Sequence, residues 1–293
     1  MIQKEQKKKS KAQFVFVISF VLFYFFIFVV NAQVVGDTFQ VINLAEKARN
    51  FFIEATKGNI IGQITDNKFG ENLLVGTTEE DIQSQGGTLT FLQSAELISI
   101  ISSDTTNDII LGNNARSIKI LGLDENFTKI EEIVNLSATG TNTTKEYIRV
   151  YRMLVQEVGT YGVTNLGTIT GTAAITGLIQ IEVPATEGQS QTTHYTVPSG
   201  HELIMTSFRV TMDTGKVIDV FIKVRENADK TSIDIMPTRI IRNFRGLDVP
   251  LERINFGNNK FGEKTDIWIT AVVSTGTAQV EANYDFLEYA IGS

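Results

Sequence analysis

From Leu73 onward the chain is a succession of short β-branched and aromatic runs separated by Gly, Asn, Asp, Thr and Ser, and this pattern constrains the fold most. Such runs between turn residues are typical of antiparallel strands. Apolar and polar residues alternate in Ile218 to Val224, Ile267 to Val273 and Val280 to Phe286, so each of these strands is expected to bury one face. Two such faces close a sandwich. The sequence therefore predicts an all-β fold of β-sandwich or jelly-roll domains.

The length of 293 residues allows two such domains in tandem. The expected strands of the first domain are Leu89 to Leu92, Leu97 to Ile101, Ser117 to Leu121, Ile130 to Leu136, Tyr147 to Val155, and Leu178 to Val183. Pro184 to Thr193 is small and polar, which is typical of a linker. We therefore expect a first sandwich at 73–187 and a second at 188–293.

The N-terminal residues 1–33 combine a lysine cluster with an apolar run from Phe14 to Val30. As a helix this run would be about 26 Å long, at the short limit for crossing a bilayer. A transmembrane anchor would keep the lysines on the cytoplasmic side and place the body on the other. The alternative is a signal peptide cleaved after Ala32, although the run is longer than the usual apolar region of a signal.

Residues 34–72 are expected to form an amphipathic helix and a connector. Asp37 can cap a helix that continues to Thr56, with apolar residues recurring near helical spacing and Gly58 ending it. Its apolar face requires a partner. Either the helix forms a stalk or oligomer contact, or it lies on its own β-domain.

The charge and the residue types exclude several classes of function. The net charge is −7, and the first eleven residues carry +4 from five lysines and Glu5, which leaves −11 on the remainder and disfavours binding to nucleic acid. The chain has no cysteine, and His194 and His201 lack the spacing of a zinc motif, so we interpret them as ordinary loop residues. We expect no enzymatic activity, no cofactor and no metal.

One polar loop holds side chains with hard oxygen atoms. These are Asp104, Asn107, Asp108, Asn113 and Asn114. Calcium favours such oxygens, but the spacing matches no EF-hand. The alternative is that these side chains satisfy backbone groups of the loop, which is the favoured interpretation.

Two sets of residues are candidates for contact with other molecules. The first is a basic cluster of Arg239, Arg242, Arg245 and Arg253, which would bind an acidic surface of a neighbouring subunit or an anionic glycan, or would pair with Asp248 and Glu252 in solvent. The second is three N-glycosylation sequons, at Asn126, Asn135 and Asn142. Sequons carry glycans only in a eukaryotic secretory lumen, and they also arise by composition.

A series of motifs follows one order along the chain. It consists of Ser102, Ser103, Asn107, Asp108, Ala115, Arg116, Gly122, Leu123, Asp124, Glu132, the Thr/Gly-rich segment from Thr139 to Thr144, and Arg149. Lys68-Phe69-Gly70-Glu71-Asn72 and Gly86-Gly87 precede it, and Tyr195 to Gly200 follow it. This order resembles capsid-associated, virion structural β-sandwich proteins of marine tailed phages and large algal viruses. The similarity covers about three quarters of the chain, from Asn67 to the C-terminus.

The resemblance implies a non-enzymatic virion structural protein: a minor capsid, spike or capsid-surface component. Its expected partners are further copies of itself and other capsid proteins, and a membrane bound through Phe14 to Val30. The alternative function is a secreted or surface-anchored bacterial adhesin that binds carbohydrate.

Overall fold

The structure is a computed structural model that describes residues 53–254 and 260–292. The chain divides into two compact units, Met1–Ile60 and Ile61–Ser293. In the first unit, residues 53–56 are helical, and the remainder of the expected amphipathic helix lies outside the described residues. The run from Phe14 to Val30 also lies outside them. Within the described residues, no helix combines the length and the hydropathy needed to span a bilayer.

The second unit contains four antiparallel sheets among its described residues, which confirms the all-β prediction. Sheet A contains β15 (Leu251–Ile254), β12 (Ser207–Met212), β18 (Ala278–Ala290), β11 (His201–Met205) and β16 (Lys260–Phe261), with β1 (Gln63–Val75) also paired to β18. Sheet B contains β10 (Tyr195–Thr196), β17 (Asp266–Val273), β13 (Ile218–Arg225) and β14 (Arg239–Leu247), with β2 (Glu80–Asp81) also paired to β17. Sheet C contains β6 (Thr141–Tyr147), β3 (Glu96–Ser102), β8 (Ile169–Ala173) and β9 (Ile179–Val183). Sheet D contains β5 (Lys129–Asn135), β4 (Ala115–Leu123) and β7 (Arg149–Val158).

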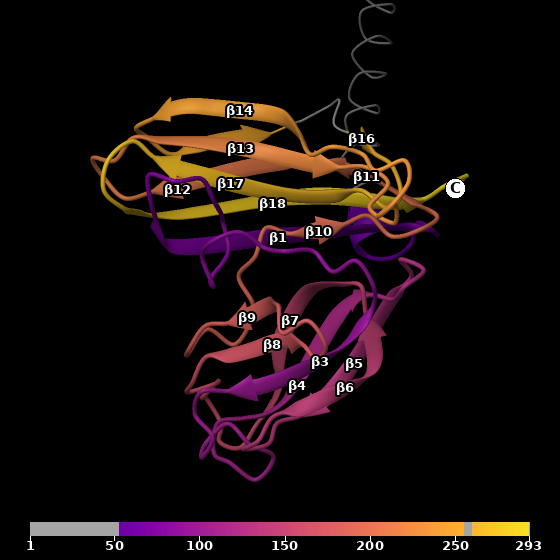
Figure 1. The fold of residues 1–293 in the computed structure, drawn as a ribbon, viewed down its shortest axis with the longest axis vertical. Helices are drawn as coiled ribbons and strands as arrows, with labels where there is room; N and C mark the ends of the chain where they lie inside the picture. Colours follow the sequence, from indigo (N-terminus) through magenta and orange to yellow (C-terminus); the bar gives the residue numbers. More distant parts are fainter. Residues whose placement is uncertain (1–52, 255–259, 293) are drawn as a thin grey trace, which may run out of the picture. The chain divides into compact units, whose positions relative to one another are not determined.

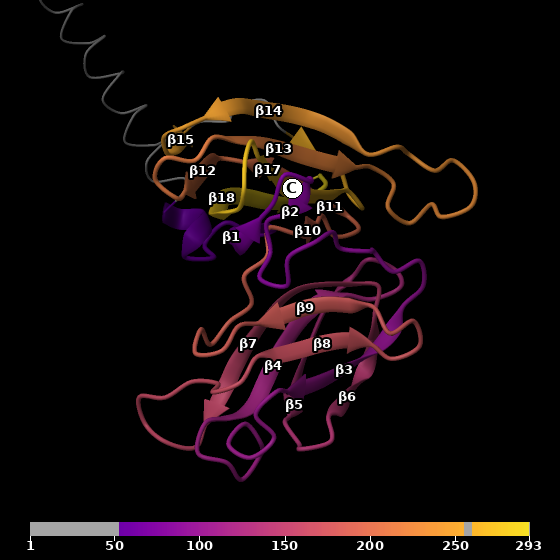
Figure 2. The ribbon, with the colours of Figure 1, turned by 60° about the vertical axis from the view of Figure 1, so that its left-hand side comes forward.

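The strands pair in a nested order rather than in tandem. β1 runs antiparallel to β18 from Gln63 opposite Tyr289 to Val75 opposite Ala278, and β2 pairs with β17. The strands β3 to β9 pair only with one another among the described strands, so we call them the insert lobe. The remaining strands form the terminal lobe (Figures 1 and 2). The last ten residues of the expected connector, 63–72, therefore belong to β1, because this strand pairs with β18, which lies 203 to 226 positions further along the sequence.

The terminal lobe is a sandwich of sheets A and B. Phe208 on β12 stacks on Phe244 of β14, with ring centroids 5.3 Å apart and planes at 12°. Tyr195 on β10 contacts Phe286 on β18 with ring centroids 4.7 Å apart and planes tilted by 39°. Side chains alternate along β18, so that its apolar positions face this core and polar positions such as Asp285 face outward. The three alternating runs seen in the sequence are β13, β17 and β18.

The insert lobe joins sheet C to sheet D through a close approach at Gly122. A Cβ at this position would lie 2.1 Å from the carbonyl oxygen of Arg149 and 2.6 Å from Tyr147 Cδ1, so only glycine fits. Five of the six strands expected here are present, with ends shifted by a few residues. Leu89 to Leu92 is not a strand. Side chains hold its backbone instead: Leu89 N–H donates to Asp81 Oδ2, and Leu92 O accepts from Arg149 Nη1.

The segment expected to be a solvated linker, Pro184 to Thr193, is buried in its second half. Ser190 Oγ accepts from Met153 N–H at 3.0 Å. Thr193 Oγ1 accepts from Ile269 N–H at 3.1 Å, and Thr193 is fully buried. Small hydroxyl side chains suit a linker in isolation, but here they satisfy backbone groups beside β7 and β17. The composition of this segment therefore reflects hydrogen bonding in the interior.

Candidate functional site

The predicted arginine cluster lies on two strands at the edges of their sheets. Arg239, Arg242 and Arg245 lie on β14, the terminal strand of sheet B, and we call this the arginine edge. Arg253 is exposed on β15, the terminal strand of sheet A. β14 pairs with β13 on one side, and no described strand pairs with its other side. The fold therefore places all four side chains on sheet edges that are available to a partner.

Arg239 and Arg245 of the arginine edge make exposed ion pairs with acids other than the expected Asp248 and Glu252. Arg239 Nη2 lies 2.8 Å from Glu226 Oε2, and Arg245 Nη1 lies 3.6 Å from Asp219 Oδ2. Arg239 and Arg245 are 51% and 67% exposed, so these pairs are worth at most about 1 kcal/mol each. Large apolar side chains are also exposed nearby in the sequence: Ile233, Ile235, Ile240 and Val249. Arginine together with exposed apolar side chains is the composition of a protein–protein interface.

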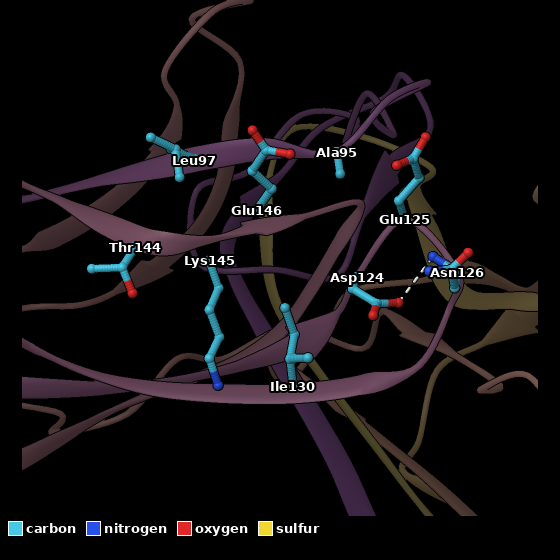
Figure 3. Close-up of a pocket in the computed structure, with 9 residues that line it drawn as sticks. All are labelled: Ala95, Leu97, Asp124, Glu125, Asn126, Ile130, Thr144, Lys145 and Glu146. Carbon is cyan, nitrogen blue, oxygen red and sulfur yellow. Dashed lines mark hydrogen bonds between the residues drawn. The ribbon is translucent and has the colours of Figure 1, made fainter.

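A pocket of about 600 Å³ lies on the insert lobe, between the turn at residues 124–126 and strands β3, β5 and β6 (Figure 3). It is lined by Ala95, Leu97, Asp124, Glu125, Asn126, Ile130, Thr144, Lys145 and Glu146. Its lining includes three carboxylates, those of Asp124, Glu125 and Glu146, and a single lysine. Lys145 Nζ points away from the Glu125 and Glu146 carboxylates in Figure 3 and donates its hydrogen bond to the carbonyl oxygen of Glu131. The lining therefore combines apolar side chains with more acidic than basic groups. Sequence reasoning missed it, since its residues come from separate segments.

All three sequons lie on exposed positions of the insert lobe. Asn126 is in the turn after β4 and lines the pocket, Asn135 ends β5, and Asn142 lies on β6. Each asparagine is accessible in the folded chain. Because β5 and β6 are the terminal strands of sheets D and C, glycans at Asn135 and Asn142 would cover sheet edges.

A buried ion pair joins β7 to β17. Arg149 Nε donates to Asp266 Oδ1 at 2.9 Å and Nη2 donates to Oδ2 at 3.1 Å, while Arg225 Nη2 donates to Oδ2 at 2.7 Å. Thr196 Oγ1 donates to Asp266 Oδ1 at 2.6 Å. Burial alone would raise the pKa of Asp266, but the two guanidinium groups and these hydrogen bonds hold it below its usual value. The role of this group is structural, because all of its hydrogen-bonding positions face protein partners.

His194 lies in the segment just before β10, outside any strand as expected, but it is buried. It is 3% exposed, its ring lies parallel to Trp268 at 6.3 Å and edge-on to Phe91 at 5.5 Å, and Nε2 lies 3.3 Å from Asp81 Oδ2. That contact lacks hydrogen-bond geometry, and Nδ1 has no partner among the described residues. His201 is partly exposed at the start of β11, with Nδ1 3.1 Å from Ser199 O. The two histidines therefore occupy different environments.

The polar loop after β3 is organised by Asp108. This carboxylate is fully buried, and it accepts hydrogen bonds from Ser102 Oγ and from the backbone N–H groups of Ala115, Leu166 and Gly167. Four donors occupy the oxygens that a calcium ion would require. No metal-binding cluster of acidic or histidine side chains occurs within residues 53–254 and 260–292. These contacts agree with the loop interpretation.

Several motif residues that carry the resemblance are buried polar groups. Lys68 is 3% exposed and donates to the carbonyl oxygen of Tyr151, while burial lowers its pKa well below the usual range. Tyr195 donates to Glu288, a buried carboxylate that also pairs with Lys129 at 2.7 Å. Their position in the interior explains their residue types, because each satisfies a group that would otherwise be unpaired.

The fold and these surfaces define the protein as an all-β, two-lobed chain with exposed sheet edges. No family model and no curated protein matches the sequence. Among solved structures, the chain is similar to one described as the infectious bursal disease virus Gx strain, with 9% identity and a TM-score of 0.20 over 79% of this chain and 71% of that one. A VP2 subviral particle of the same virus has 10% identity and a TM-score of 0.16 over 78% and 76%. TM-scores this low carry no argument about the fold, which rests instead on the strand pairing of this chain.

Proposed function

We propose that this protein is a non-enzymatic virion structural protein, a minor capsid, spike or capsid-surface component that assembles with copies of itself and other capsid proteins. The observation that carries the proposal is β14, a nine-residue edge strand. It presents three exposed arginines on a chain of net charge −7. Solvent-facing edges are normally shielded, often by lysine or proline. An arginine-bearing edge with exposed isoleucine instead suits a contact surface.

The order of motifs from Lys68 to Gly200 supports a viral setting over a bacterial one. The carbohydrate-binding alternative gains little from the pocket, since none of its nine described lining residues is aromatic. Sugar-binding sites of small-molecule size generally include aromatic faces among a few polar groups. A glycan array probed with the full chain tests this alternative directly.

We further infer that Phe14 to Val30 tethers the protein to a membrane within or around the particle. Placing a lysine at the bilayer centre costs about 2.5 to 3.5 kcal/mol. The N-terminal lysines therefore support an orientation in which they stay on one side of the membrane and the body lies on the other. Intact mass of the protein taken from its native particle tests the tether. A chain that begins at Gln33 would show that the segment is a cleaved signal.

The assembly proposal is tested by sedimentation of the full chain in mild detergent, at several protein concentrations, together with immunogold labelling of purified particles. We expect concentration-dependent oligomers and label on the particles. A chain that remains monomeric at every concentration and does not copurify with particles would contradict the proposed function.

A further inference from the structure

We propose that the arginine edge of one copy binds the acidic pocket on the insert lobe of a second copy, so that the chain self-associates head to tail. This inference rests on the proposed function and specifies how its copies join. It follows from charge complementarity between two surfaces of the same chain. One surface presents three arginines on β14, and the other presents Asp124, Glu125 and Glu146.

Arg239 and Arg245 can release their acidic partners at low cost. Their ion pairs, with Glu226 and Asp219, are solvent-exposed, so exchange for carboxylates of another copy loses little free energy. Ile240 lies between the arginines and is 52% exposed. Burial of this side chain against a partner would add a hydrophobic contribution to the electrostatic one.

The pocket matches the chemistry of an arginine side chain. Its apolar lining residues, Ala95, Leu97 and Ile130, suit the methylene stem, and its carboxylates suit the guanidinium group. Glu125 and Glu146 form no ion pair with any residue that the structure describes, and in Figure 3 both carboxylates point away from the Lys145 ammonium group. Asp124 is less available, because its Oδ1 accepts from the N–H groups of Asn126 and Thr128.

The contact is heterologous, because the two surfaces are different patches of one chain. In a pair of copies, the copy that uses its arginine edge keeps a free pocket, and the copy that uses its pocket keeps a free arginine edge. Such an interface continues into a ring where the rotation closes and into an open row where it does not. A lattice of structural subunits can be extended in this way.

The test uses charge reversal of each surface in the full chain. One variant carries Arg239→Glu, Arg242→Glu and Arg245→Glu, and the other carries Glu125→Lys and Glu146→Lys. Each alone places like charges on both surfaces, so we expect the self-association constant from sedimentation to fall at least about 100-fold, the loss of two or more charge pairs at an interface. Mixed in equal amounts, the variants present complementary surfaces, and association is expected to return to within about tenfold of the original.

Arg209→Glu on β12 and Glu157→Lys on β7 are matched controls, since both side chains are exposed and lie away from the two surfaces. Circular dichroism melting curves confirm that every variant folds. The inference is overturned if the Glu125 and Glu146 variant associates as the original does, or if the mixture fails to recover. Oligomers that persist through both variants would leave the proposed function standing and remove only this interface.

Discussion

Arg149 and Asp266, 117 positions apart in the sequence, form a two-pronged ion pair that is almost entirely buried. The pair joins the insert lobe to the terminal lobe through β7 and β17. Phe91 lies over the guanidinium group of Arg149, with 4.7 Å from Cζ to the ring centroid. The carboxylate is thus neutralised by cations whose own planar faces are covered, which keeps the group dry and fixed in orientation.

Removal of the Asp266 charge is expected to be among the most destabilising single changes. Asp266→Asn leaves Arg149 buried without its counter-charge, and breaking such a pair costs about 3 to 5 kcal/mol. The free energy of unfolding from urea titration measures this loss. Glu226→Gln, which breaks the exposed pair with Arg239, serves as the control and should cost less than about 1 kcal/mol. Equal losses would contradict the structural importance of the buried pair.

The lowered pKa of Asp266 predicts that the free energy of unfolding falls at acidic pH. The pKa of Asp266 is lowered in the folded state, so the native form binds fewer protons than the unfolded form near the usual aspartate value. Its contribution is present above the unfolded pKa of about 3.9 and is lost as the pH falls through the lower folded pKa. Urea titrations from pH 6 to 2 should show a shallower decline for Asp266→Asn than for the unchanged chain, whereas Asp248→Asn, an exposed substitution, should decline as the unchanged chain does.

The lowered pKa of Lys68 predicts how stability changes with pH above neutrality. Burial holds its pKa well below the usual range, so between the folded and unfolded pKa values the unfolded chain binds more protons and stability rises with pH. The Lys68→Met variant keeps the apolar stem and should lose this rise between pH 7 and 9.5. That window stays below pH 10, above which the raised pKa values of Tyr195 and Tyr284 would reverse the trend. An unchanged slope in the variant would be evidence against a desolvated ammonium group.

The two histidines should respond differently to substitution. His194→Gln disturbs a buried ring between Phe91 and Trp268 and is expected to cost about 1 to 3 kcal/mol. His201→Gln alters a partly exposed side chain and should change stability by less than about 0.5 kcal/mol. Thermal melting of the two variants under one buffer compares them. Similar small effects would restore the interpretation of both as loop residues.

Asp108 is expected to hold the loop after β3 to the segment at Leu166 and Gly167. Asp108→Ala removes the acceptor for four donors at once, so the loss should exceed about 3 kcal/mol. Hydrogen exchange at the Leu166 and Gly167 amides measures the effect locally, and both should lose protection. Asp104→Ala, in the same loop but at its surface, should leave these two amides protected, and added calcium should rescue neither variant.

The periods of three strands were readable in the sequence, because side-chain alternation is a local property of each run. The arginines were readable only as a cluster, without the edge strand that carries three of them. The runs that became β13, β17 and β18 show the alternation directly. By contrast, β6 (Thr141–Tyr147) has a Thr-rich composition that also suits a loop, and only its pairing with β3 makes it a strand. Local composition does not distinguish these two states when propensities are balanced.

The sequence by itself determined an all-β chain and a local cluster of arginines, since β-branched runs and turn residues act over a few positions. Tertiary structure decided which strands meet: that β1 pairs with β18, that the Ser190 to Thr193 segment is interior, and that Arg149 reaches Asp266. These outcomes depend on which distant surfaces exclude water together and satisfy each other's polar groups. Such a competition among pairings is settled over the whole chain, and no short stretch of residues encodes it.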